Sequence, residues 1–152
     1  MFSPSEENYL KAIYALQCDQ GSPISTNLIS EKICTKASSV TDMLKKLSAK
    51  NLVDYQKYQG VFLTDQGMKH ALKVLRKHRL WEFFLVEKLN YKWEEVHVIA
   101  EQLEHINSES LVDNLDAFLG YPKFDPHGDP IPDKNGILSL SELNNLLEAG
   151  GW

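Results

Sequence analysis

The sequence predicts a mainly α-helical fold, and three observations support this. Apolar residues recur at helical spacing through most of the first 50 residues and again after residue 65. A short stretch between these regions, residues 52–64, instead alternates between apolar and polar residues, which indicates two strands. Proline and glycine occur where the helical patterns stop. A chain of 152 residues can bury one core, or two small cores that share a long helix.

The first two helices have well-marked ends. Ser3 can cap the first helix, and Glu6 stands where a capping box needs its second member. Gly21 ends that helix. Ser25 can cap a short second helix, which is predicted to run to about Ile33.

A third helix and a hairpin complete the first half of the chain. The helix is predicted to begin near Ser38 or Ser39, and its apolar face, which belongs to the core, consists of Val40, Met43, Leu44 and Leu47. The alternating stretch then forms a hairpin with its turn at Gln59 and Gly60. Three helices followed by a hairpin, within residues 1–64, is the order of a winged helix-turn-helix. In that arrangement the third helix enters the major groove of DNA.

The second half is predicted to be helical throughout. A helix from Thr64 to about Asn90 would be about 40 Å long, and helices of this length usually bridge domains or build a dimer. Two further helices are predicted, from Trp93 to about Asn107 and from Ser110 to Leu119. Residues 65–121 are therefore expected to form a helical domain. The proline-rich and glycine-rich residues after it indicate a linker and a tail, residues 122–152.

The two halves of the chain carry net charges of opposite sign. Residues 1–80 hold 12 Lys and Arg against 7 Asp and Glu, a net charge of +5. Residues 81–152 hold 4 against 14, a net charge of −10. The basic half suits phosphates, whereas the acidic half suits a hard cation or simply a solvated surface.

The sequence contains neither of two signals that would direct the protein out of the cytoplasm. No apolar run approaches the roughly 18 residues of a membrane span, and no secretion signal precedes the first helix. We therefore expect a cytoplasmic protein without a membrane partner. Cys18 and Cys34 have no metal-binding spacing, and we interpret them as buried or unreactive thiols rather than a disulfide.

DNA contacts are predicted at the start of the third helix. Small hydroxyl residues allow a helix to approach base edges and phosphates, and lysines add affinity that does not depend on sequence. The candidates are Lys36, Ser38, Ser39, Thr41, Asp42, Lys45, Lys46 and, on the hairpin, Lys57. Lys50 and Tyr58 extend the same face. The alternative is a capped surface helix with ordinary solvated lysines.

Histidine and glutamate recur at helical spacing in the acidic half. The spacing of four, three and one residues places His97, Glu101, Glu104 and His105 on one stripe of a helix, and His78 and Glu82 share a face of the preceding helix. Imidazole nitrogens and carboxylate oxygens that converge from two helices suit Mn, Fe(II), Co, Ni or Zn. The alternative is a set of solvated pairs.

Several separate motifs, in order, resemble the diphtheria toxin repressor and manganese transport regulator family. They are Glu6 to Tyr14, Ser38 to Thr41, Tyr58 to Gly67, Arg79 to Leu85, Glu101 to His105 and Pro126 to Pro132, and the resemblance covers about residues 3–133. It implies a homodimeric repressor of metal-uptake genes that binds double-stranded operator DNA. Mn(II) or Fe(II) would be the corepressor, and no small organic substrate is implied.

The resemblance also implies the metal ligands. Glu101, Glu104 and His105 would form one site, completed from the first helix by Asn8, so that one ion orients the DNA-binding half against the dimerisation half. A second or ancillary site would consist of His78, Glu82 and His97. Leu138 to Leu143 resemble the start of a further barrel domain cut short, a docked terminal helix is equally allowed, and we expect no complete third domain.

The chain departs from the manganese branch of the family at two ligand positions and from the iron branch at one. Asn8 replaces an aspartate of the manganese branch and Lys11 replaces a glutamate, which disfavours a second cation at that place. Glu101 stands where the iron branch has a cysteine, so the ligand set holds only oxygen and nitrogen.

Two other functions compete with this interpretation. One is a winged-helix regulator that is not controlled by metal. The other is a di-iron enzyme, which needs two Glu-x-x-His motifs, whereas the sequence has only Glu94 to His97. The sequence also lacks a Ser/His/Asp set and a glycine-rich phosphate loop, so we expect no catalysis.

Overall fold

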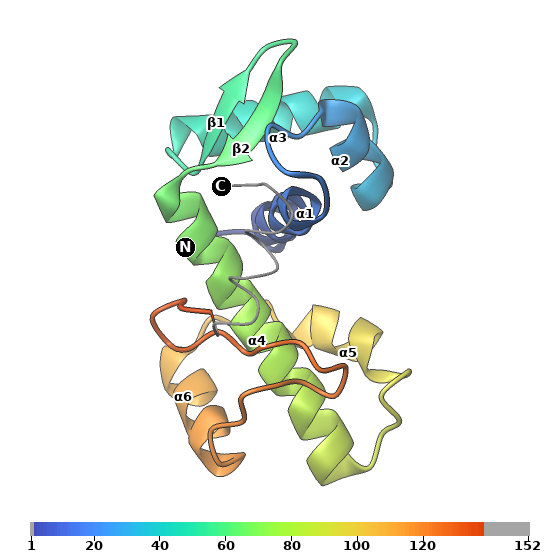
Figure 1. Ribbon diagram of the computed structural model, residues 1–152, viewed down its shortest axis with the longest axis vertical. Helices are drawn as coiled ribbons and strands as arrows, with labels where there is room; N and C mark the ends of the chain where they lie inside the picture. The colour runs from blue at the N-terminus through green and yellow to red at the C-terminus, as the bar shows by residue number, and fades with distance from the viewer. Residues whose placement is uncertain (1, 139–152) are drawn as a thin grey trace. The chain divides into compact units, whose positions relative to one another are not determined.

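The computed structural model describes residues 2–138, which form helices and one small sheet (Figure 1). The elements are α1 (Pro4–Gln20), α2 (Thr26–Ile33), α3 (Ala37–Ala49), β1 (Val53–Gln56), β2 (Gly60–Leu63), α4 (Asp65–Leu89), α5 (Val96–Leu103) and α6 (Glu109–Phe118). The chain divides after Ala71 into two compact units, and α4 contributes residues to both. The prediction for residues 138–143 falls almost wholly outside the described residues.

The first unit begins with the capping box that the sequence predicts. The Glu6 amide donates to Ser3 Oγ at 3.1 Å, and the Ser3 amide donates to Glu6 Oε1 at 3.0 Å. Both bonds satisfy amides that a helix start otherwise leaves without partners. Ser25 caps α2 as predicted, by accepting from the Leu28 amide at 3.2 Å.

The core of the first unit collects the apolar faces of its three helices. Its fully buried side chains include Leu10, Ile13, Ile29, Val40, Leu44 and Leu47. Met43, which the sequence places on the same face of α3, is only partly buried. The helix also begins one residue earlier than predicted, at Ala37, and Lys36 is its N-cap.

The hairpin is present, but its turn lies earlier than predicted. The Gln59 amide donates to the Gln56 carbonyl at 2.9 Å, and Tyr58 has a φ of 69°. Gly60 lies inside β2 rather than in the turn, paired with Gln56. Glycine is needed there because a Cβ would lie 2.7 Å from the carbonyl oxygen of Ile24.

One lysine of the first unit is held inside an ion pair. The Lys50 ammonium contacts the buried carboxylate of Glu6 and lies 5.3 Å from the centre of the Phe2 ring. This pair joins the end of α3 to the start of α1. Lys50 therefore contributes to the fold of this unit.

In the second unit, α5 and α6 lie on either side of α4 (Figure 1). Helix α6 packs through Val112 and Leu115 against Leu80 of α4. Arg76 of α4 reinforces this contact, since its guanidinium lies 3.0 Å from Asp116. No helix within residues 2–138 combines the length and apolar character that a bilayer crossing needs.

Helix α5 is shorter than the sequence predicts. It begins at Val96 and ends at Leu103, so Trp93 lies in the preceding turn and His105 lies beyond the helix. Of the four ligands predicted on this helix, His97 and Glu101 therefore lie within α5, and Glu104 and His105 follow its end. Glu104 is the C-cap residue of α5 and is fully buried.

The segment after α6, interpreted above as a linker, packs against α4. The Asp125 carboxylate accepts from the amides of His127, at 2.9 Å, and Asp129, at 2.8 Å, which closes a tight turn. Arg79 of α4 donates to the carbonyl of Pro130. These bonds hold Asp125 and His127 next to α4.

Candidate metal centre and DNA-binding surface

Glu82 is the centre of the candidate metal site. Its side chain lies on α4 and is buried, with the residue only 1% exposed. Its Oε2 atom lies 3.4 Å from His78 Nε2 and 3.7 Å from His97 Nδ1, and its Oε1 atom lies 3.6 Å from His127 Nδ1. Oε2 makes no hydrogen bond of good geometry among the described residues. A buried carboxylate oxygen in these surroundings fits a cation, because a buried charge needs a close partner.

Two compact groups of ligand atoms share Glu82. One consists of His78, Glu82 and His97, and the other of Glu82, Asp125 and His127, with the atoms of each group within 4.8 Å of one another. Ligands bonded to one ion at about 2.0–2.2 Å lie about 3–4 Å apart. Small side-chain movements would therefore place either group around an ion. The mixture of imidazole and carboxylate suits divalent first-row ions.

The sequence pattern does not predict Asp125 and His127 as candidate ligands. They lie in the segment that its prolines and glycines indicated to be a linker. A signal was present, because an aspartate and a histidine two residues apart in a proline-flanked turn can present both side chains to one point. Nothing in that spacing alone, however, shows which element the turn contacts.

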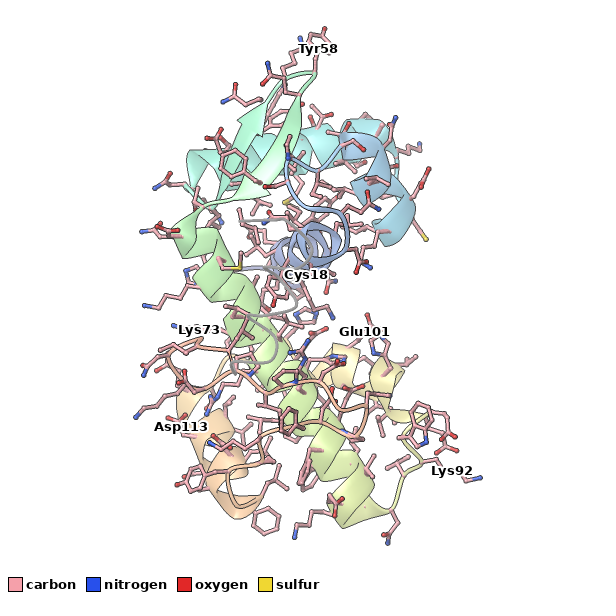
Figure 2. All side chains as sticks on the ribbon, viewed as in Figure 1. Cys18, Tyr58, Lys73, Lys92, Glu101 and Asp113 are labelled. Atoms are coloured by element: carbon pink, nitrogen blue, oxygen red, sulfur yellow. The ribbon has the colours of Figure 1, made fainter. Side chains whose placement is uncertain are left out.

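The other predicted ligands lie in different surroundings. Glu104 is fully buried, with Oε2 3.6 Å from His78 Nδ1, so it borders the first group. Glu101 lies on α5 (Figure 2) with its Oε1 atom 3.4 Å from His97 Nε2, and about half of its side chain is exposed. His105 is half-buried, and Asn8 is exposed on α1 in the first unit. Within residues 2–138, Glu101, Glu104 and His105 do not form a third compact group. Their joint site, and the role of Asn8, stay predictions.

Burial raises the pKa of both carboxylates, but their neighbours give Glu82 and Asp125 opposite net shifts. Burial raises the pKa of Glu82, but the nearby His78 and His127 outweigh it, and the pKa is lowered. At Asp125, burial together with the negative charges of Asp129 and Glu82 raises the pKa to about 6, despite the Asp129 amide and Arg79. Asp125 is thus the carboxyl that takes up a proton first as the pH falls.

Metal affinity is therefore expected to depend on pH. Below about pH 6 a proton on Asp125 must leave before the carboxylate can bind an ion. Between pH 7 and pH 5, protonation of this one group weakens Mn(II) binding about tenfold. Calorimetry at pH 5.5 in two buffers of different ionisation enthalpy counts the protons released on binding, including those from the imidazole ligands. In an Asp125→Asn variant this count is expected to fall, and equal affinities for the unsubstituted chain at pH 5 and pH 7 would contradict the expectation.

The predicted DNA-binding residues lie on the surface of the first unit. Most of the candidates on α3 are exposed, namely Lys36, Ser38, Ser39, Asp42, Lys45 and Lys46, and so is Lys57 of the hairpin. Thr41 is partly buried, and its hydroxyl donates to the Ala37 carbonyl at 3.1 Å. Tyr58 lies at the tip of the hairpin, 94% exposed (Figure 2).

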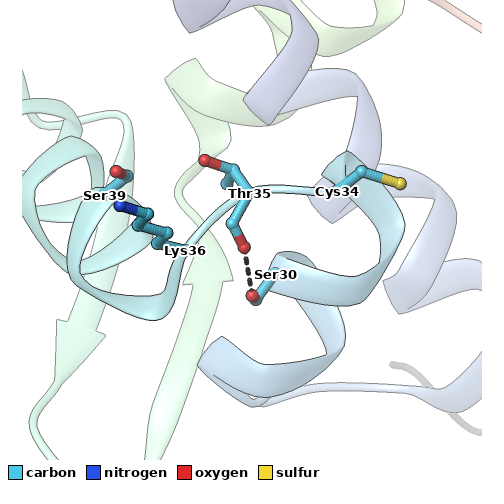
Figure 3. A pocket seen from close by; sticks show the side chains of 5 residues that line it. All are labelled: Ser30, Cys34, Thr35, Lys36 and Ser39. Atoms are coloured by element: carbon cyan, nitrogen blue, oxygen red, sulfur yellow. Dashed lines mark hydrogen bonds between the residues drawn. The ribbon is translucent and has the colours of Figure 1, made fainter.

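A pocket of about 530 Å³ lies where α2 meets α3 (Figure 3). It is lined by Ser30, Cys34, Thr35, Lys36 and Ser39, and the Ser30 hydroxyl donates to the Thr35 carbonyl. Hydroxyl groups and an ammonium beside a helix start are the groups that bind phosphate oxygens. Cys34, whose side chain points away from the other lining residues in Figure 3, is an exposed cysteine outside any disulfide.

Known proteins resemble this chain in sequence, and solved structures resemble it in fold. An uncharacterized HTH-type transcriptional regulator of Methanocaldococcus jannaschii is 36% identical over 117 residues, which are 77% of this chain and 94% of the relative. The iron-dependent repressor IdeR of Mycobacterium leprae is 34% identical over 134 residues, 88% of this chain and 56% of the repressor. A solved manganese-dependent transcriptional repressor in complex with manganese is 43% identical, with a TM-score of 0.81 over 88% of this chain and 61% of that one.

Two family models cover most of the chain. The iron-dependent repressor N-terminal DNA-binding domain matches residues 1–61, and the iron-dependent repressor metal-binding and dimerisation domain matches residues 64–133. The chain spans little more than half the length of the mycobacterial repressor. The order of both domains, the fold and the identities agree, and the chain belongs to the iron-dependent repressor family.

Proposed function

We propose that this protein is a transcriptional repressor of metal-uptake genes that binds operator DNA when Mn(II) or Fe(II) is present as corepressor. The observation that carries the proposal is the buried Glu82, shared by two groups of nitrogen and oxygen ligands. These groups lie within the residues matched to a metal-binding and dimerisation domain. A solvated histidine and glutamate pair, the alternative, would not bury its carboxylate.

The ligand chemistry favours a hard or intermediate ion. The candidate ligands are carboxylates, such as Asp125 and Glu101, and histidines. They offer oxygen and nitrogen atoms, and none of them is a thiolate. This set suits Mn(II) and Fe(II) and gives no preference for softer ions. The solved relative in complex with manganese supports the same choice.

The chain's own residues link the metal to DNA. Bound metal supplies positive charge beside carboxylates that repel each other, as Glu82 and Asp125 do. Asp125 and His127 then hold the segment after α6 against α4, which orders the unit that pairs two subunits. The paired subunits present two α3 helices to successive major grooves, about 34 Å apart. The coupling free energy between two such binding sites is typically about 1–3 kcal/mol, so bound metal is expected to raise the affinity for DNA about 5–150-fold.

Metal-dependent DNA binding tests the proposal. A preferred duplex is first selected from randomised double-stranded DNA with Mn(II) present, and its affinity is then measured by fluorescence anisotropy with Mn(II), with Fe(II) under anaerobic conditions, and with chelator. We expect the chelator to weaken binding about 5–150-fold. Glu104→Ala is expected to abolish this response and to leave salt-sensitive, nonspecific binding in place, because the first unit is unchanged.

The matched control is Glu109→Ala, which removes an exposed carboxylate from the start of α6 in the same unit. This variant should keep the full response to Mn(II). Equal affinities for the selected duplex with and without metal would support a winged-helix regulator without metal control.

A further inference from the structure

Trp93 makes two contacts with one of the candidate ligands, His127. Its backbone carbonyl oxygen lies 3.2 Å from His127 Nε2. Its indole ring lies edge-on to the imidazole, with 5.2 Å between ring centres and 78° between ring planes. Trp93 stands in the turn before α5 and is 53% exposed, so core packing alone does not account for its position.

The carbonyl contact determines which nitrogen of His127 carries the proton. A carbonyl oxygen only accepts, so the bond requires Nε2–H as the donor. In the neutral ring, Nδ1 then has a free lone pair. Nδ1 is the atom that faces the two carboxylates, 3.6 Å from Glu82 Oε1 and 3.9 Å from Asp125 Oδ2. A histidine that binds metal through one nitrogen commonly donates its other N–H to a carbonyl or carboxylate.

We propose that Trp93 is a positioning residue for the group formed by Glu82, Asp125 and His127. The carbonyl fixes the tautomer in which Nδ1 can bind an ion, and the indole edge restricts rotation of the imidazole. This inference rests on the proposed function, because it assumes that the group binds metal. It assigns a role to a residue that lies outside both compact ligand groups.

The tautomer can be measured without metal. Nitrogen-15 chemical shifts of the His127 ring, recorded at pH 8 on the full chain, distinguish Nε2–H from Nδ1–H. We expect Nε2–H in the unsubstituted chain and in Trp93→Phe, which keeps an aromatic edge, and a mixture in Trp93→Gly, which frees the backbone of the turn. A predominant Nδ1–H form in the unsubstituted chain would overturn the proposal.

Mn(II) titrations then test the consequence for binding. Free Mn(II) is counted by electron paramagnetic resonance for the unsubstituted chain and the two variants. Trp93→Gly is expected to weaken one class of site about tenfold, the lower range for loss of a partner that orients a ligand. Trp93→Phe is expected to stay within about threefold. Tyr91→Gly, which removes another exposed aromatic residue before α5, is the control for a loosened turn and is expected to bind like the unsubstituted chain.

A double-mutant cycle separates positioning from a general effect. In a His127→Ala background, Trp93→Gly is expected to change Mn(II) affinity no further, because both act through the same ligand. The proposed role of Trp93 would be overturned if Trp93→Gly lowered Mn(II) affinity a full tenfold in that background, or not at all in the unsubstituted chain. Either result would leave the proposed function standing. If the unsubstituted chain binds no Mn(II), the proposed function is overturned as well.

Discussion

Replacing Glu82 by glutamine is expected to lower Mn(II) affinity more than about 100-fold, because partners that merely orient a ligand already contribute 10–100-fold. The substitution preserves volume at a residue that is 1% exposed, and it removes the carboxylate shared by both ligand groups. Calorimetric or paramagnetic resonance titration with Mn(II) measures the loss. Mn(II) is expected to raise the melting temperature of the unsubstituted chain, and this stabilisation is expected to disappear together with the affinity.

Glu87→Gln provides the matched control for this prediction. Glu87 lies on the same helix but is exposed. Its replacement removes one negative charge and should leave Mn(II) affinity almost unchanged. Comparable affinities for Glu82→Gln and Glu87→Gln would mean that the metal binds elsewhere.

Replacing Gly67 by alanine is expected to destabilise the protein by more than about 3 kcal/mol, at the upper end of overpacking effects. Gly67 lies in the first turn of α4, where alanine would ordinarily be favoured by about 1 kcal/mol. A Cβ at this position would lie 1.9 Å from the carbonyl oxygen of Leu52 and 3.3 Å from Leu63 Cδ2. Backbone and side chain would both have to move.

Denaturant unfolding followed by circular dichroism measures this effect. Gln66→Ala, a change at the exposed neighbouring position, is the control and should leave stability within about 0.5 kcal/mol. An alanine variant at residue 67 as stable as the unsubstituted chain would show that helix propensity outweighs the close approach to Leu52.

Features that depend on neighbouring residues could be predicted from the sequence. The capping box of Ser3 and Glu6 and the cap at Ser25 involve residues three apart, and both are present. The position of the hairpin turn could not be predicted in the same way. Gly60 is needed because the backbone of Ile24 pairs with Val61, 37 residues away along the chain, and no local pattern encodes that contact.

The candidate metal site also combines features that depend on neighbouring residues with features that depend on distant ones. The spacing of His78 and Glu82 places both on one face of α4, and the structure has their side chains 3.4 Å apart. The contribution of Asp125 could not be predicted, because it depends on the turn after α6 folding back onto α4. Arg79, which holds the Pro130 carbonyl, lies 51 residues earlier in the chain.

The ion pair between Lys50 and Glu6 has a consequence for electrostatics on DNA. Each phosphate that a lysine neutralises releases condensed counterions, so the slope of log affinity against log salt concentration counts the participating cations, at about 0.9 per phosphate. The Lys50 ammonium already faces a carboxylate, and a phosphate contact would require breaking that pair. We therefore expect four lysines to contribute to this slope, namely Lys36, Lys45, Lys46 and Lys57. Lys50 is expected not to contribute, although it lies at the end of the same helix as three of them.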